Sequence, residues 1–296
     1  MEGLFVSAAP LMLAGIGALL SDLSGALGIF IEGFMNAGAF FSWVFAGWTG
    51  SVFTGVLLSA MLAGLAGWGL AYFVRISGAN PFIAGLAVNL AVAGLTNTLS
   101  AAWFGTKGVL RSPGLSAAVP IDIPLLKSIP FLGQLFSGHS AFVYAAWALT
   151  ITASFIIGKT AIGFRLSASG AAPEACLERG IRPELYREGA WAAAAFLAAL
   201  AGAALTFRVG AYTPGGAAGR GWIALAAVYL GFRRVWGVAA AALLFSMAER
   251  LGYGIQSFGI IPATALLGLP AALALVLYTV SNWAGRKKFN APPPPE

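Results

Sequence analysis

Long, uninterrupted apolar runs constrain the fold of this chain more than any other feature. Seven runs fall within the range of about 17 to 25 apolar residues that a helix needs to cross a bilayer. Only 9% of the 296 residues are charged and 59% are hydrophobic, whereas a soluble domain carries about a quarter charged residues. The runs are continuous rather than alternating, which excludes an outer-membrane barrel. The sequence therefore predicts an all-α membrane protein.

The predicted architecture is a polytopic helical bundle of about nine transmembrane segments with broken helices. Two of the segments, Trp222–Phe232 and Val235–Met247, are short for full crossings. One membrane domain is expected over residues 1–289, followed by a disordered Pro-rich tail over residues 290–296. The seven longer expected spans are Leu4–Leu20, Leu23–Ala46, Ser51–Val74, Pro81–Phe104, Ala141–Ile157, Gly189–Phe207 and Pro262–Ser281.

The most charged stretch of the chain lies between two of these runs. Residues 159–188 hold nine of its Lys, Arg, Asp and Glu side chains. Pro173 suits the first position of a helix, Glu174 lies at the positive end of its dipole, and Gly180 suits a left-handed stop after Arg179. The pattern predicts a capped, water-facing helix presented to another molecule. An ordinary solvated loop is the alternative.

The basic residues predict the orientation of the chain in the membrane. If the 159–188 stretch is cytoplasmic and the spans alternate, eleven Lys and Arg residues lie inside and six outside, as the positive-inside rule requires. The N-terminus is then outside and the C-terminus inside. The long loop Gly105–Ser140 faces outward, and its apolar part, Ile121–Phe136, suits either a folded lid or a passive loop.

Two stretches interrupt the helical pattern inside the membrane. The first runs from Ser21 to Asn36 and contains Gly25, Gly28 and Glu32, the last being the only acid well within an apolar run. An intramembrane carboxylate is expensive and indicates a functional site. The alternative is that Glu32 binds backbone amides and holds a broken helix in place.

The second interruption is the Gly-rich stretch Pro214–Gly221, which leads into the short run Trp222–Phe232. A break followed by a half-length helix is typical of the discontinuous helices that line transport sites. The two breaks fall in the front and back halves of the chain, as a weak internal repeat would place them.

Polar residues within the apolar runs are candidates for lining a path. Asn89 and Asn97 lie eight residues apart, so they are predicted to share a helix face. Interhelical hydrogen bonds explain such residues as well as substrate contacts do. With the residues of the two breaks, the predicted substrate pathway comprises Gly28, Phe30, Glu32, Asn36, Asn89, Asn97 and Trp222.

The composition also argues against several kinds of chemistry. One cysteine, Cys176, and one histidine, His139, exclude disulfides within the chain and Cys- or His-rich metal sites. No phosphate-binding Gly-x-x-x-x-Gly-Lys-Ser/Thr loop is present, and no nucleophile–base pair indicates an enzyme. Glu32 alone offers little for coupling an ion to a solute. Energy for uphill transport is therefore expected to arrive mechanically, through the 159–188 stretch.

Several motifs together resemble a known family. The quoted stretches are Ala9-Pro10-Leu11, Gly17-Ala18-Leu19, Glu32-Gly33-Phe34-Met35, Gly85-Leu86-Ala87-Val88-Asn89-Leu90, the loop residues Gly163, Arg165, Leu166, Ala168, Gly170, Pro173 and Ala175, and Gly219-Arg220-Gly221-Trp222-Ile223-Ala224. The chain resembles the permease subunits of ABC importers in the ribose, nucleoside and branched-chain amino acid group. The likeness is strongest to the shorter permease of nucleoside-type, basic membrane protein-linked systems.

The resemblance implies a set of partners in a bacterial cytoplasmic membrane. An ATP-binding cassette subunit would bind ATP and Mg, so no cofactor is expected in this chain. A second, paralogous permease would complete the pathway as a heterodimer, and an extracytoplasmic substrate-binding lipoprotein would deliver the solute. The resemblance also implies that the loop is a cytoplasmic coupling helix docking into the ATPase, formed by Gly170, Pro173, Glu174, Ala175, Cys176, Arg179 and Gly180.

One departure from the family pattern bears on the solute. Many nucleoside-type members carry Asn-Ile-Gly-x-Glu-Gly in the second span, where this chain has Gly28-Ile29-Phe30-Ile31-Glu32-Gly33. Nucleosides, simple sugars and riboflavin therefore all stay open as solutes. The rival function is a self-sufficient secondary carrier or facilitator that uses Glu32 as its coupling group.

Overall fold

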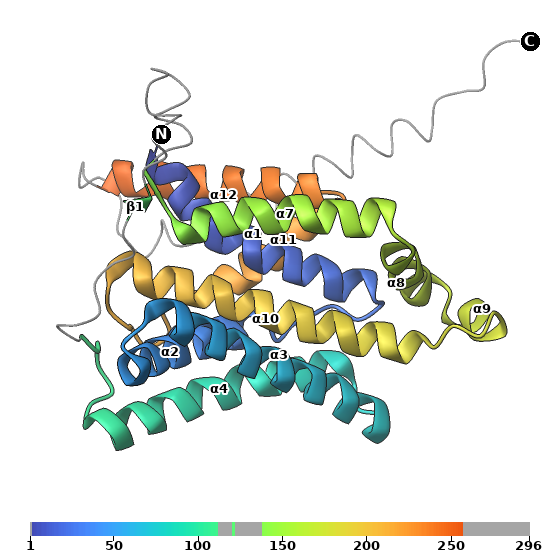
Figure 1. The fold of residues 1–296 in the computed structure, drawn as a ribbon, viewed down its shortest axis with the longest axis horizontal. Coiled ribbons are helices and arrows are strands. Elements are labelled where there is room, and N and C mark those ends of the chain that lie inside the picture. Colours follow the sequence, from blue (N-terminus) through green and yellow to red (C-terminus); the bar gives the residue numbers. More distant parts are fainter. Residues whose placement is uncertain (1, 112–119, 122–137, 257–296) are drawn as a thin grey trace, which may run out of the picture.

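A computed structural model describes residues 2–111, 120–121 and 138–256. The long helices run side by side along one axis, and two short helices, α8 and α9, extend the molecule at one end (Figure 1). Two short strands, β1 (Pro120–Ile121) and β2 (His139–Ser140), pair antiparallel. The helices are α1 (Glu2–Leu23), α2 (Ile31–Thr49), α3 (Val52–Ser77), α4 (Pro81–Phe104), α7 (Ala141–Lys159), α8 (Ala161–Ala171), α9 (Pro173–Glu178), α10 (Pro183–Val209), α11 (Arg220–Leu230) and α12 (Val235–Gln256).

The membrane class is confirmed, but the count of about nine segments is not. Within the described residues, six helices are long and apolar enough to cross a bilayer: α1, α3, α4, α7, α10 and α12. The half-length of α11 is as expected. The expected span Pro262–Ser281, the Pro-rich tail and nearly all of the stretch Ile121–Phe136 lie outside the described residues.

Two expected spans have different bounds in the structure. The span predicted over Leu23–Ala46 is wrong at its start, because residues 24–30 are not helical and α2 begins at Ile31. Gly25 adopts a left-handed φ of 88°, and the Ser21 hydroxyl accepts a hydrogen bond from the Gly28 amide at 3.0 Å. These contacts turn the chain out of α1. The break lies within the interruption predicted over Ser21–Asn36, but the sequence does not show where α2 begins, because that depends on the placement of these groups.

The segment Val235–Met247, predicted to be short, is part of a full-length helix. α12 continues to Gln256, and its first 18 residues suffice for a span. Glu249 and Arg250 lie within this helix. Glu249 forms an ion pair with Arg220, and the Arg250 guanidinium packs against Gly3 at the start of α1.

α10 is the central helix, packed against α1, α2 and α3. Its sequence is rich in Ala, and these small residues are buried over most of its length. At its crossing with α2, a Cβ on Gly202 would overlap the Met35 carbonyl, and a Cβ on Gly38 would overlap the backbone of Ala199. Small residues allow this close approach, which is how helices associate in lipid.

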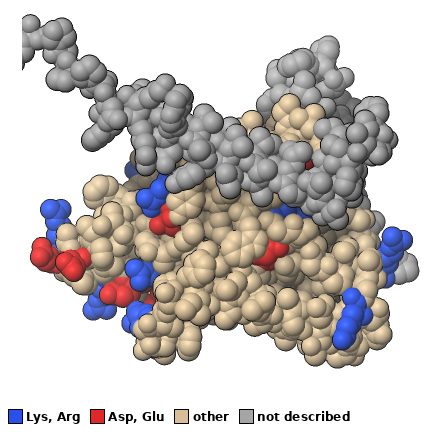
Figure 2. Space-filling view, turned by 180° about the vertical axis from the view of Figure 1, so that it is seen from behind, with Lys and Arg blue, Asp and Glu red and all other residues tan. Residues whose placement is uncertain are grey.

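Ion pairs fasten the end of the bundle that carries α8 and α9, here called the α9 end. Arg75 of α3 pairs with Glu188 of α10 at 2.7 Å, and Arg233 pairs with Asp22 of α1 at 2.6 Å. Figure 2 shows that charged side chains gather mainly toward the two ends of the visible face, and that uncharged surface fills much of the space between them.

Candidate functional site

Two broken helices meet at their N-termini inside the bundle. α2 begins after residues 24–30, and α11 begins after the connection 210–219, which leaves α10. Glu32, in the first turn of α2, accepts hydrogen bonds from the Gly219 amide at 2.9 Å and the Gly221 amide at 2.7 Å. Its two carboxylate oxygens thus cap the start of α11 from another helix.

Asn36 extends this contact by one turn of α2. Its side-chain oxygen accepts a hydrogen bond from the Ala217 amide at 3.2 Å. Its Nδ2 group donates to the Glu32 carbonyl at 3.1 Å, which fixes the orientation of the amide. One face of α2 therefore holds the second half of the connection in place.

Asn89 of α4 caps α2 in turn. Its side-chain oxygen accepts a hydrogen bond from the Gly33 amide at 2.7 Å, and its Nδ2 group donates to the Ile29 carbonyl at 2.8 Å. The residue that precedes α2, Phe30, provides no side-chain cap of its own. The three polar side chains thus form a series that links α4 to α2 and α2 to α11.

The electrostatics explain why a carboxylate is found at this junction. Two helix N-termini meet, and each carries a partial positive charge and unpaired amides. A buried amide without an acceptor costs about 1 to 3 kcal/mol, and Glu32 supplies an acceptor to two of them. These are the contacts expected of the interpretation in which Glu32 binds backbone amides and holds a broken helix in place.

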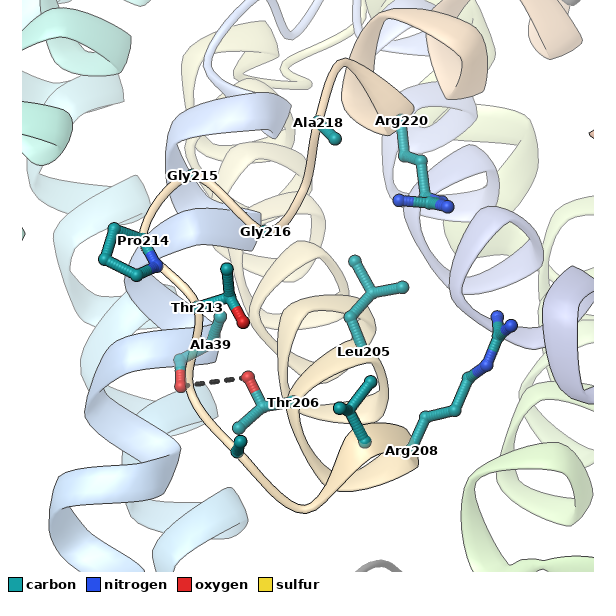
Figure 3. Close-up of a pocket in the computed structure, with 12 residues that line it drawn as sticks. Ala39, Leu205, Thr206, Arg208, Thr213, Pro214, Gly215, Gly216, Ala218 and Arg220 are labelled. Atoms are coloured by element: carbon teal, nitrogen blue, oxygen red, sulfur yellow. Dashed lines mark hydrogen bonds between the residues drawn. The ribbon is translucent and has the colours of Figure 1, made fainter. Parts of the chain in front are cut away.

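A cavity of about 360 Å³ lies beside the junction (Figure 3). Arg208, in the last turn of α10, and Arg220, the first residue of α11, point toward one another along its edge. Arg220 pairs with Glu249 of α12 through Nε at 3.4 Å. The lining consists of Ala39, Leu205, Thr206, Arg208, Val209, Ala211, Thr213, Pro214, Gly215, Gly216, Ala218 and Arg220.

The far side of the connection is also anchored. Leu110, after α4, and Tyr212 exchange two backbone hydrogen bonds of 3.0 Å. Tyr212 is buried and packs edge-on against Phe40 of α2. The connection 210–219 is therefore held at both ends, by Leu110 at one and by Asn36 and Glu32 at the other.

The remaining predicted pathway residues have varied surroundings. Gly28 is buried in the first break. Phe30 is fully buried against Trp191, with ring centroids 4.8 Å apart. Trp222 is 43% exposed on α11.

The shared face predicted for Asn89 and Asn97 is wrong. Asn89 contacts α2, whereas Asn97 is exposed. The two side chains diverge because eight residues advance a helix about 80° beyond two turns.

Three residues at this site were not singled out by the sequence reasoning. Arg208 and Arg220 are among the six basic residues expected on the outer side, and Arg220 is also part of the Gly219–Ala224 motif, but neither is predicted to line the pathway. In the structure the Arg220 side chain is just 15% exposed and lies inside the bundle. Glu249 was overlooked as an acid within an apolar helix. Glu249 lies 14 residues after Val235, within the length of a spanning helix, so its position could have marked it as an acid inside the membrane. No group of acidic, His or Cys side chains in the described parts of the chain could hold a metal ion.

Comparison with known proteins decides the family. The family model for the permease component of branched-chain amino acid transport systems matches residues 1–283. The chain belongs to this permease family. The resemblance drawn from its motifs is thereby confirmed, and the family's membrane subunits are generally non-catalytic.

Curated relatives of this permease are transport subunits. It is 29% identical to a guanosine ABC transporter permease protein of Bacillus subtilis, over 93% of this chain and 89% of that one. It is 28% identical to a putative glucose ABC transporter permease protein of Haloferax volcanii, over 86% and 77%. It is 27% identical to a nucleoside ABC transporter permease protein of Lactococcus lactis, over 93% and 89%. No solved structure matches the permease.

Proposed function

We propose that this permease forms part of the translocation pathway of an ATP-driven importer, and that it moves a small solute by alternating access. The family match over residues 1–283 carries the proposal. The printed names of the relatives specify guanosine, nucleosides and glucose. A nucleoside or a simple sugar is therefore the favoured solute, and riboflavin is a further, larger candidate.

The geometry of α9 suits the predicted coupling helix. Pro173 occupies its first turn with Glu174, and Gly180 follows it with a φ of 72°. Five of its six residues are exposed, and Leu177 at 54% exposure offers an apolar contact among charged neighbours. Cys176 alone is buried. A short, exposed helix of this kind is a suitable docking element for an ATP-binding subunit.

Contacts behind α9 offer a route by which a push could reach both breaks. Gly170 of α8 packs directly on the backbone of Leu23 and Gly25, at the first break. α10 begins shortly after α9 and extends to the cavity at the second break. Movement of α8 and α9 would thus be transmitted to residues 24–30 and, through α10, to residues 210–219.

The remaining partners are proposed from the family. ATP and Mg would be bound by the ATPase at the α9 end, so that end would be cytoplasmic. The N-terminus lies at the opposite end (Figure 1), where a substrate-binding lipoprotein would dock. A second, paralogous permease would pack along the membrane-facing helices. Large apolar side chains are exposed on α3 and α4, among them Leu65, Phe73, Ile83 and Leu90.

The rival function, a self-sufficient carrier, would require Glu32 to gain and lose a coupling ion. Both carboxylate oxygens of Glu32 are occupied by backbone amides. Protonation would take one acceptor from α11. This arrangement supports a positioning role for Glu32 over a coupling role.

The double substitution Glu174→Lys with Arg179→Glu tests the proposed coupling. We expect it to abolish ATP-driven solute uptake in cells that carry the partner subunits, because it reverses the charge pattern of the docking helix. The amount of permease in the membrane should be unchanged. Lys107→Glu, an exposed charge reversal outside α9, is the control for the effect of a charge reversal on the amount of permease in the membrane.

Affinity purification of tagged permease from native membranes distinguishes the two functions. An ATP-binding subunit and a second permease should be recovered with it. Full uptake by the double variant would exclude α9 as the coupling helix. Recovery of the permease as a homo-oligomer alone would favour the self-sufficient carrier.

A further inference from the structure

The cavity beside the junction has the size and location of a solute site. Small-molecule pockets span about 300 to 1,000 Å³, and this cavity has about 360 Å³. Its wall includes Ala218, which lies between two residues whose amides are held by α2: Ala217 by Asn36, and Gly219 by Glu32. The cavity and the junction of the broken helices therefore share one stretch of backbone.

Arg208 is the unpaired charge of this cavity. It is exposed and has no hydrogen-bond or ion-pair partner within the ranges that the structure describes. Arg220 differs, because Glu249 neutralises it through Nε. Its guanidinium group lies on the side of the cavity from which Arg208 approaches (Figure 3). The cavity thus offers donors from two guanidinium groups but carries the net charge of only one.

Besides the two arginines, the cavity is lined by two threonines and by several apolar residues. The Thr206 hydroxyl donates to the Ala39 carbonyl at 3.2 Å, so its proton is used. Thr213 is exposed to the cavity, while Leu205, Val209 and Pro214 supply apolar surface. A flat ring would find an apolar wall here and donors at its edge.

We propose that this cavity binds a nucleoside with a 6-oxopurine base, whose neighbouring carbonyl oxygen and ring nitrogen accept hydrogen bonds from Arg208 while Arg220 supplements the donors. A planar guanidinium matches two adjacent acceptors of this kind. Adenosine presents an amino donor in place of the carbonyl, which would face the Arg208 donors. The assignment rests on the proposed function, of which it specifies the substrate class.

A cysteine within the cavity gives a local readout that needs no partner subunit. Thr213→Cys places a thiol in the lining, and a charged thiosulfonate reagent should modify it in membranes that contain the full chain. Guanosine should protect this thiol, and adenosine should need about 10-fold higher concentration for equal protection, because a bidentate Arg contact contributes about 1 to 3 kcal/mol of discrimination. The native Cys176 is buried at the α9 end.

Matched variants assign the protection to Arg208. Arg208→Gln in the Thr213→Cys chain should raise the guanosine concentration for half-protection about 10-fold. Arg111→Gln removes an exposed charge outside the cavity and should leave it unchanged. A thiol at Thr49→Cys, exposed outside the cavity, should react at the same rate with and without guanosine.

A second substitution keeps the test valid if Arg208→Gln does not accumulate. Arg208→Lys retains the positive charge but loses the planar pair of N–H donors. Guanosine should therefore protect the Thr213→Cys thiol less well, and the difference in protection between guanosine and adenosine should fall. Equal protection by the two nucleosides in the Thr213→Cys chain would overturn the assignment. So would protection that is identical in the Arg208 variants and in Arg111→Gln.

The failure of this assignment is distinguishable from failure of the importer. ATP-driven guanosine uptake without protection of the Thr213→Cys thiol would overturn the cavity site and leave the importer standing. Arg208-dependent protection in a chain that purifies without an ATP-binding subunit would support the site and overturn the importer.

Discussion

Glu32 is the residue on which both broken helices depend. A carboxylate near the middle of a membrane protein is commonly read as a proton or ion carrier. Here its oxygens satisfy two backbone amides at the start of α11. Glu32 also lies in the first turn of α2, where its negative charge interacts favourably with the positive end of that helix's dipole. These contacts support a role for Glu32 in holding the start of α11 against α2.

Glu32→Gln should lower the thermal unfolding midpoint of the purified permease. One oxygen would be replaced by an NH₂ group that cannot accept from an amide, which costs about 1 to 3 kcal/mol. ATP dependence of uptake should persist. Glu178→Gln, an exposed neutralisation on α9, is the control for charge and should leave the midpoint unchanged. Loss of an ion requirement in Glu32→Gln would instead identify a carrier.

The sequence predicted some residues of the site and missed others for a physical reason. Glu32, Asn36 and Asn89 stood out because a polar group in an apolar run is conspicuous. Arg208 and Arg220 did not, because basic residues near the ends of runs have an ordinary explanation in membrane orientation. Only the tertiary placement of Arg220 beside Glu249 distinguishes it from a flanking charge.

At the scale of elements, the crossing of α2 and α10 depends on the absence of side chains. Gly202→Ala should destabilise the permease, because a Cβ there overlaps the Met35 carbonyl and overpacking typically costs about 1 to 3 kcal/mol. Gly94→Ala on α4 is the matched control, since no atom lies within 4 Å of a Cβ there. Thermal unfolding of both variants in the same detergent measures the difference. Equal midpoints would contradict the tight crossing.

Element boundaries were predictable where local chemistry sets them. α4 and α9 begin at Pro81 and Pro173, as predicted, because proline fits the first helical turn. α10 also begins at a proline, Pro183, six residues before the expected span. The start of α2 and the end of α12 were not predicted. The first depends on the Ser21 contact with Gly28, whereas α12 continues past Glu249.

At the scale of the whole molecule, the two ends of the bundle are chemically distinct. The α9 end carries the Arg75–Glu188 and Asp22–Arg233 pairs, which join α3 to α10 and α1 to the corner before α12. The Trp68 indole adds a hydrogen bond to Glu188 at 3.2 Å. The helices are thus fastened to one another where the ATPase is proposed to push.

The proposed orientation predicts which end faces the cell exterior. Thr49, at the end of α2, and Ser77, at the end of α3, are exposed at opposite ends of the bundle. A membrane-impermeant thiol reagent should label Thr49→Cys in intact cells and Ser77→Cys only after permeabilisation. The reverse pattern would place α9 outside and would rule out its docking to a cytoplasmic ATPase.

The meeting of two helix N-termini also has a consequence for dissolved anions. Such a point attracts anions from solution. Glu32 supplies the balancing negative charge from a side chain that is covalently attached and cannot diffuse away. The junction therefore needs no anion from solution to occupy the two helix ends.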